Sequence, residues 1–295
     1  MASLTPIRVA AFAMRTRFEI VLWDAARTDA DLRAAGEEAL REIAETETLL
    51  SAYRPDAALY RLNEQTRAAA GTFAVPTRLA FFLRYTQLIS RLTQGAFDPT
   101  LGDADTVTFD PIRSVSETPF SGHQFVTTSR PGVRFDAGAI GKGYALDRAR
   151  ESLREAGIRN ALLHGGTSSV VALGNEPGGD AWRVAIASPR REAPPVAVWH
   201  LRDGDAMAVS ANHERPGHIL DPRTKQPVPH ARLAAVLVSG GVVLEQGDAA
   251  LADAVSTALL VLGEAGIPAL RGSFPEVREW LLAGKESPDG NAKEF

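Results

Sequence analysis

The stretch that decides the fold is Phe135-Asp136-Ala137-Gly138-Ala139-Ile140-Gly141-Lys142-Gly143-Tyr144-Ala145-Leu146-Asp147. Its glycines predict a tight turn, and the residues that follow predict a helix from Lys142 to Ala156 that ends at Gly157. A glycine-rich turn at the start of a helix brings backbone N–H groups close to an anion. Taken alone, the stretch also fits an ordinary strand-to-helix turn, so its meaning depends on the rest of the chain.

Two later segments supply groups that could act on a phosphate. Ala252-Asp253-Ala254-Val255-Ser256-Thr257-Ala258 places Asp253 and Thr257 four residues apart on a predicted helix. We expect both side chains on one exposed helix face, where their oxygens can hold a hard cation such as Mg2+. The other segment, Gly217-His218-Ile219-Leu220-Asp221-Pro222-Arg223-Thr224, adds a histidine and an aspartate beside a proline turn. Together the three segments predict chemistry on a diphosphate.

The composition indicates an enzyme-sized globular chain. With 295 residues, 45% apolar and 23% charged, it can form one large domain or two interleaved subdomains. A net charge of −4 argues against nucleic acid as a partner. The absence of cysteine excludes disulfides, thiolate catalysis and cysteine zinc sites in this sequence, and we expect no lipoprotein anchor. The apolar patch Val9–Met14 is too short for a secretion signal or a membrane span, so we expect a cytoplasmic protein without a membrane anchor.

Hydrophobic periodicity predicts an α+β fold, with mixed sheets and packed helices. Helices are expected over residues 29–50, 77–93, 142–156 and 248–262, with glycines just after the last three. An opening strand is expected at 9–14, continuing at 18–23, and loops with short strands over 103–131. The tail after Gly284 is polar and expected to fray. Further short apolar runs predict strands at 161–163, 169–173, 183–187, 196–199, 207–209 and 233–239.

Four further motifs accompany the three segments. They are Met14-Arg15-Thr16, the stretch 51–63 that opens with Ser51-Ala52-Tyr53-Arg54, Gly95-Ala96-Phe97-Asp98-Pro99-Thr100, and Gly165-Gly166. In this order the seven motifs resemble the ApbE-type flavin transferases, which take FMN from FAD and attach it through a phosphoester to a threonine or serine of a target flavoprotein. The resemblance covers nearly all of the chain. It implies one ApbE-like domain over residues 1–295, built as two interleaved subdomains with the FAD cleft between them.

The resemblance also implies residue roles. Asp253 and Thr257 would hold Mg2+ together with the backbone carbonyl of Ala139, an oxygen-only ligand set that suits this metal. Asp136 and Lys142 would contact FAD, with the lysine acting as a point charge on phosphate. The residues that would line the flavin and adenosine pockets are Met14, Ala96, Phe97, Asp98 and Ile219.

The implied reaction is substitution at phosphorus. The metal and Lys142 would neutralise charge while the acceptor hydroxyl attacks and AMP leaves. His218 would accept the hydroxyl proton, because imidazole titrates nearest to neutral pH. Asp221 would orient His218 or contact the cofactor.

Three departures from the family pattern affect the site. Arg15 stands where the family has the glycine of Met-Gly-Thr, and Lys225 where it has the last glycine of His-Ile-x-Asp-Pro-x-Thr-Gly. In the segment 210–215, an alanine and a histidine replace a glycine and a tyrosine. Loss of turn glycines changes the backbone angles that are easily reached, which bears on cofactor fit more than on the fold.

Alternative readings remain at this stage. The same site with water as the acceptor would be an FAD pyrophosphatase, and without catalysis it would be an FAD-binding or storage protein. Asp98 fits a cap on the Pro99 turn as well as a cofactor contact. His218 fits a hydrogen-bonded structural histidine. Phe81, Phe82 and the tryptophans are expected to pack in the core.

Overall fold

The computed structural model describes residues 5–109, 123–189, 192–212, 217, 219–229, 232–239, 247–284 and 293–294. Within them the main feature is an eight-stranded sheet in the order β1-β2-β6-β7-β10-β13-β14-β15, and each neighbouring pair is antiparallel. The strands are β1 Ile7–Ala13, β2 Thr16–Leu22, β6 Ala161–Gly165, β7 Ser169–Leu173, β10 Ala206–Ala211, β13 Arg232–Val238, β14 Val277–Gly284 and β15 Lys293–Glu294.

The first two strands form a hairpin, so the prediction of one continuous opening strand is wrong. The chain reverses at Met14 and Arg15, whose φ angles are 48° and 62°. Positive φ at both central residues is characteristic of the type I′ turn, one of the two common two-residue hairpin turns. Neither residue is a glycine or asparagine, and this is why the turn is hard to find from the sequence.

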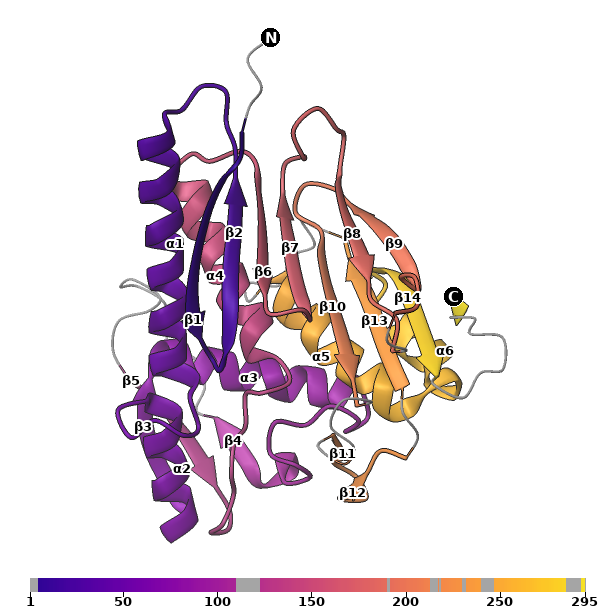
Figure 1. The fold of residues 1–295 in the computed structure, drawn as a ribbon. Helices are drawn as coiled ribbons and strands as arrows, with labels where there is room; N and C mark the ends of the chain where they lie inside the picture. The colour runs from indigo at the N-terminus through magenta and orange to yellow at the C-terminus, as the bar shows by residue number, and fades with distance from the viewer. Residues whose placement is uncertain are drawn as a thin grey trace.

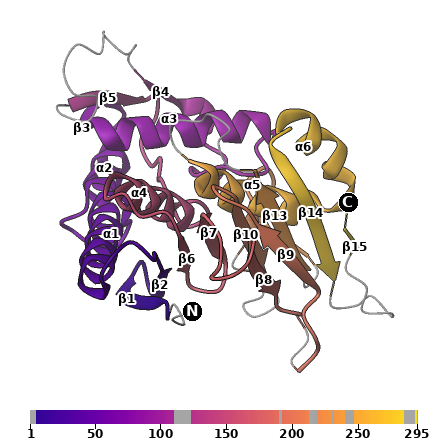
Figure 2. The same ribbon diagram turned by 90° about the horizontal axis from the view of Figure 1, so that it is seen from above.

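Three long helices cover one face of this sheet: α1 Asp29–Leu50, α4 Gly141–Glu155 and α5 Asp248–Leu262 (Figures 1 and 2). All three were predicted, and α1 begins with a capping box between Thr28 and Asp31. Helix α5 is apolar on almost every side and lies between the sheet and helix α3, Thr77–Leu92. The helix after the glycine-rich turn is therefore held in the middle of the molecule.

A smaller subdomain is inserted between α1 and α4. It comprises α2 Ala58–Ala68, α3, the short 3-10 helix Ala104–Thr106 and a three-stranded sheet in the order β3-β5-β4. Its strands are β3 Gly71–Pro76, β4 Val107–Phe109 and β5 His123–Thr128. The main sheet takes strands from before and after this insertion, so the two parts alternate along the chain (Figure 1). Helix α2 was not predicted, and residues 110–122 of the predicted loop region lie outside the described residues.

The opposite face of the main sheet is covered in part by a hairpin of β8 Trp182–Ile186 and β9 Ala197–Leu201. Both its tryptophans, Trp182 and Trp199, are buried against the sheet. A two-stranded sheet of β11 Leu220–Asp221 and β12 Gln226–Pro227, a 3-10 turn Glu264–Gly266 and α6 Ile267–Ser273 complete the described elements.

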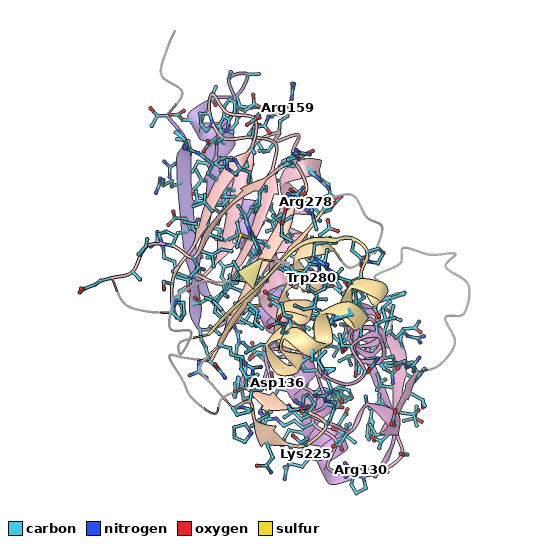
Figure 3. The ribbon with its side chains drawn as sticks, turned by 90° about the vertical axis from the view of Figure 1, so that its right-hand side faces the viewer. Arg130, Asp136, Arg159, Lys225, Arg278 and Trp280 are labelled. Carbon is cyan, nitrogen blue, oxygen red and sulfur yellow. The ribbon has the colours of Figure 1, made fainter. Side chains whose placement is uncertain are left out.

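The expectation for the large aromatics holds for Phe82, Trp182, Trp199 and Trp280, which are buried, whereas Phe81 and Trp23 are half-buried. Phe82 and Trp280 are each 1% exposed, and Trp280 lies in the middle of the molecule, between the ends where Arg159 and Arg130 lie (Figure 3). The predicted frayed tail is wrong for Lys293 and Glu294, which pair with Leu282 and Leu281 of β14.

Among the described residues, no single helix is long and apolar enough to cross a membrane. Helix α5 and residues 264–273 would pass the same test of length and composition if taken together, but the chain bends by 119° between them.

Candidate active site

The site is organised by the crossing of α4 and α5, which cap each other. The backbone N–H of Gly143, in the first turn of α4, donates to Oδ2 of Asp253 at 2.8 Å. In return, Asp147 of α4 accepts from the N–H groups of Ala249 and Ala250, in the first turn of α5, at 3.1 and 2.8 Å. These are the N–H groups that a helix start leaves without partners. Each helix therefore fixes the start of the other.

Gly143 makes this crossing possible because it has no side chain. A Cβ at this position would lie 2.1 Å from the carbonyl oxygen of Ala249 and 2.7 Å from the nitrogen of Ala250. Both are backbone atoms of α5, so a rotamer change could not relieve the contact. The glycines of the opening stretch serve helix packing here as well as the turn itself.

Asp147 also belongs to a buried charge network. Arg150 lies 3.2 Å from Asp147 and 3.1 Å from Asp248, and its guanidinium donates to the carbonyl of Gly204. Burial raises the pKa of Asp147 to about 7, while Arg150 and the two backbone donors act against that rise.

This network predicts a pH-dependent stability. Because the folded-state pKa of Asp147 lies above the unfolded value of 3.8, the folded chain keeps a proton between pH 3.8 and about 7. The free energy of unfolding should then fall as the pH rises through this window. Between about pH 4.5 and about pH 7.5, we expect the free energy of unfolding to fall by a few kcal/mol more in the wild type than in Asp147→Asn. Urea unfolding of both proteins at these two pH values measures the difference. Parallel changes in the two proteins would contradict this assignment.

Asp253 is buried, so the expectation of an exposed helix face is wrong for it. Its side chain accepts from the Ser169 hydroxyl at 2.6 Å on Oδ1, in addition to the Gly143 N–H on Oδ2. Burial raises the pKa of this carboxyl group, and Lys142, Ser169 and Gly143 oppose that effect. Each carboxylate oxygen has two lone pairs and uses one for its hydrogen bond, so both oxygens can still coordinate a metal ion.

The other two proposed metal ligands lie around the same point. Thr257 is half-buried, and its hydroxyl contacts Ser210 Oγ at 3.0 Å and donates to the Asp253 carbonyl at 3.1 Å. The N–H of Gly143, which would reach the Ala139 carbonyl in a longer helix, donates to Asp253 instead. Among the described residues the Ala139 carbonyl then accepts no backbone hydrogen bond. A free carbonyl, a carboxylate and a hydroxyl are hard oxygen donors, which fit Mg2+.

Most of the predicted site residues line one cavity of about 1180 Å³. Lys142 lies in its wall, and within the described ranges no carboxylate comes within ion-pair distance of its ammonium group. No three histidine, aspartate or glutamate side chains converge in that same part of the chain, so a metal here would depend on mixed oxygen ligands. The predicted residues that line the cavity are Met14, Ala96, Phe97, Asp98, Asp136, Ala139, Lys142, Ile219, Asp253 and Thr257.

Two aspartates of this set are already engaged in turns. Asp98 accepts from the N–H and the hydroxyl of Thr100, both at 2.7 Å, and from the Gly102 N–H at 3.0 Å. Its side chain thus caps the Pro99 turn, while the residue still lines the cavity. Asp136 accepts from the Gly138 N–H at 2.7 Å and thereby holds the glycine-rich turn in shape.

Asp221 does not line this cavity. Its carboxylate forms a paired contact with the guanidinium of Arg223, at 2.9 and 2.7 Å, and this hydrogen bonding lowers its pKa. The neighbouring Ile219 does reach the cavity. His218 and residues 213–216 lie outside the described residues, so the roles given to His218 and to the altered segment stay predictions.

Several residues of the site were given no role in the sequence analysis. Ser169 and Ser210 contact the proposed metal ligands. The run Gly165-Gly166-Thr167-Ser168-Ser169 between β6 and β7 is the sequence signal for Ser169, and Ser210 opens the altered segment 210–215. Glu47 of α1 accepts from the Met14 N–H at 2.8 Å and fixes the hairpin turn at the cavity wall. Arg15 lies 5.8 Å above the Tyr53 ring, at the same wall.

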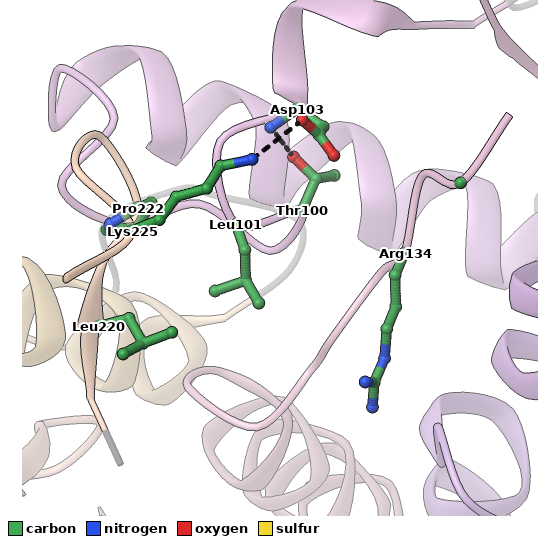
Figure 4. Close-up of a pocket in the computed structure, with 8 residues that line it drawn as sticks. Thr100, Leu101, Asp103, Arg134, Leu220, Pro222 and Lys225 are labelled. Atoms are coloured by element: carbon green, nitrogen blue, oxygen red, sulfur yellow. Dashed lines mark hydrogen bonds and ion pairs between the residues drawn. The ribbon is translucent and has the colours of Figure 1, made fainter. Parts of the chain in front are cut away.

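A smaller pocket of about 260 Å³ adjoins the cavity and shares Leu101, Leu220 and Pro222 with it. The Lys225 ammonium points at Asp103, 3.7 Å away, as Figure 4 shows. Seen from the side, Lys225 lies near Arg130 at the same end of the molecule, with Asp136 above them (Figure 3). Lys225 stands where the family resemblance expects a glycine, and its φ of 58° is in the region that glycine favours.

Comparison with known proteins identifies the family. A family model described as the ApbE family matches residues 14–279. The chain belongs to the ApbE family. A protein named FAD:protein FMN transferase from Rhodobacter capsulatus is 35% identical over 230 residues, which are 68% of this chain and 42% of that protein. One of the same name from Salmonella typhimurium is 28% identical over 73% of this chain and 67% of its own length. This chain therefore matches less than half of the length of the Rhodobacter relative.

Solved structures of ApbE proteins have the same fold. The flavin transferase ApbE from Vibrio cholerae superposes with a TM-score of 0.76 at 22% identity, over 99% of this chain and 97% of that one. The ApbE protein from Thermotoga maritima gives a TM-score of 0.77 at 21% identity, over 98% and 96%. The predicted α+β, ApbE-like architecture is confirmed by these likenesses.

Proposed function

We propose that this protein transfers FMN from FAD to a threonine or serine hydroxyl of a target flavoprotein and releases AMP. The observation that carries the proposal is the convergence in one cavity of Asp253, Thr257, the free Ala139 carbonyl and the Lys142 ammonium group. A cation and an ammonium group that forms no ion pair with the described residues, beside a glycine-rich turn, suit a diphosphate. The names of the relatives point to the same reaction.

The residues that line the cavity have different proposed roles. Asp253, Thr257 and the Ala139 carbonyl would hold Mg2+, which when bound supplies positive charge to the phosphate oxygens. Lys142 would bind the diphosphate, and Asp136 keeps the turn beside it in place. Met14, Ala96, Phe97 and Ile219 offer the apolar surface that the flavin and adenosine rings need. Asp98 supports this wall through the Pro99 turn.

The reaction is a substitution at the FMN-side phosphorus. The acceptor oxygen forms the new phosphorus–oxygen bond, the bond to the bridging oxygen breaks, and AMP leaves with that oxygen. The hydroxyl proton goes to a base, for which we propose His218. Asp221 would position the segment that carries His218, since it is tied to Arg223 in the turn that follows.

The test uses the purified protein with FAD, Mg2+ and a bacterial cell extract as the source of acceptors. We expect AMP release and proteins that keep flavin fluorescence after denaturing electrophoresis, with a mass increase of FMN minus water. Without the extract, FMN release should be slow because water is a poorly positioned acceptor. Fast FMN release at a rate that does not depend on the extract would indicate an FAD pyrophosphatase. Bound FAD without any turnover would indicate a storage protein.

The diphosphate also predicts ligand preference. If the glycine-rich turn, Lys142 and the metal all contact phosphate, FAD should bind at least about 100-fold more tightly than riboflavin, which has no phosphate. Calorimetry with Mg2+ present measures both affinities. The preference should shrink when EDTA removes the metal. Equal affinities for FAD and riboflavin would contradict a phosphate site at this turn.

A further inference from the structure

The cavity extends well beyond the proposed FAD and metal residues. Its volume is about 1180 Å³, and its lining continues past the residues that we assign to FAD and the metal. The extension runs over the outer face of the main sheet, where its floor is Leu162, Val170, Met207, Val209 and Leu233. We call this part of the cavity the sheet-face arm. None of these residues belongs to the set that we assign to FAD or to the metal.

Strand β8 forms one wall of the sheet-face arm, and the part of β8 that faces the cavity is its backbone edge. Residues 183–188 line the cavity consecutively. Neighbouring side chains of a strand point to opposite faces, so a strand seen from its face would contribute only alternate residues. Within β8 the side chains of Trp182 and Ile186 are buried and those of Arg183 and Ala185 are exposed, as that alternation requires. A cavity that touches both kinds must run along the backbone edge.

This edge of β8 is unpaired in the described part of the chain. Strand β8 hydrogen-bonds to β9 alone, in a two-stranded sheet. Figures 1 and 2 show β8 on the side of the hairpin nearer to β7 and β10, so its free edge faces the sheet-face arm. An unpaired edge is a template for another strand.

The arm reaches the reaction centre. Ser168 and Ser210 line the cavity at its inner end. The Ser168 carbonyl accepts from the Val209 N–H at 2.7 Å, and the Ser210 hydroxyl contacts Thr257 at 3.0 Å. A polypeptide lying along β8 would thus have one end beside the proposed metal ligands.

We propose that the acceptor protein binds as an extended segment that pairs with the free edge of β8. Its alternate apolar side chains would pack on Leu162, Val170 and Val209, and its hydroxyl residue would lie beside Thr257. The inference rests on the proposed transfer to a protein hydroxyl and names how that partner is recognised. The apolar floor and the backbone edge together suit an extended peptide. Of the described residues that line the cavity on this face, His164 and Arg183 carry groups that could pair with phosphate, and Arg183 is already paired with Glu176.

The first test uses the wild-type protein. A library of 12-residue peptides with one fixed central threonine is incubated with FAD and Mg2+, and the peptide that gains FMN fastest becomes the probe. Backbone N-methylation is then scanned along this probe. Because every second N–H of a paired strand donates to its neighbour, methylation at alternate positions should slow labelling about tenfold or more, and at the intervening positions less than about threefold. A scan without this period of two would overturn the proposal.

The second test uses two variants of the hairpin. Val184→Trp enlarges a half-buried side chain that lines the arm, whereas Val198→Trp enlarges a side chain on β9 that is 53% exposed and does not line it. We expect Val184→Trp to raise the KM for the probe about tenfold or more and to leave the Kd for FAD within about twofold. Val198→Trp should change neither constant. Unchanged kinetics in Val184→Trp, or an equal loss of FAD affinity, would show that the acceptor does not use the arm.

Failure of this inference and of the proposed function can be told apart. If proteins of a cell extract gain covalent flavin but no peptide of the library does, recognition by an extended segment is wrong and the transfer stands. If neither is labelled, the proposed transfer itself fails.

Discussion

Replacing Asp253 by asparagine is expected to reduce FMN transfer by a factor on the order of 10³, because the proposed metal site loses its only anionic ligand. The substitution keeps the shape of the side chain. The new amide oxygen can accept from the Gly143 N–H, and its NH2 group can donate to Ser169, so the two buried hydrogen bonds survive. AMP release at saturating FAD and thermal unfolding without metal measure the two effects separately, and we expect the melting temperature to change little.

Two comparisons sharpen this test. Asp253→Ala should lose activity and also about 1–3 kcal/mol of stability, since it leaves the Gly143 N–H and the Ser169 hydroxyl buried without their acceptor. Asp205→Asn changes a buried aspartate that lies outside the helix crossing and does not line the cavity, and should keep transfer within about threefold. Full activity in Asp253→Asn would remove the metal assignment.

The parts of the fold that could be predicted were the long periodic segments. Helix α1 repeats its buried residues at Leu32, Ala39, Ile43 and Leu50, and the glycines after α3, α4 and α5 have positive φ as helix ends commonly do. Regular apolar spacing and a stop signal therefore sufficed for these elements. Their mutual arrangement did not follow from periodicity. It came from the family resemblance, and the structural likenesses confirm it.

The hairpin of β1 and β2 shows why other parts could not be predicted. Its turn is made by Met14 and Arg15 in conformations that glycine and asparagine usually supply. The family's Met-Gly-Thr carries the glycine that would have marked the turn, and this chain has Arg15 in its place. The Glu47 side chain, which accepts from the Met14 N–H, supports the turn from α1. A contact between residues that far apart is invisible to local pattern analysis.

The burial of Asp253 could have been inferred from its helix. Helix α5 has one charged residue in its first turn and then only Asp253 among small and apolar residues. A helix that is apolar on all sides is a buried helix, so the one carboxylate within it needs partners. Those partners, Gly143 and Ser169, come from distant parts of the chain. Only the packed structure shows that the glycine-rich turn and the aspartate share a hydrogen bond.

Substituting Gly143 by alanine is expected to lower the free energy of unfolding by about 3 kcal/mol or more, because the added Cβ would lie 2.1 Å from the Ala249 carbonyl oxygen. Intrinsic helix propensity predicts the opposite sign, a gain of up to about 1 kcal/mol. Gly272→Ala in α6 is the matched control, since a Cβ there meets nothing within 4 Å. The urea midpoints of both variants decide between packing and propensity.

Separating α4 from α5 also moves the Gly143 N–H and the Ala139 carbonyl away from Asp253, so any folded Gly143→Ala protein should bind Mg2+ weakly and transfer FMN slowly. A stable and active Gly143→Ala protein would show that the two helices need not be this close for the site to work.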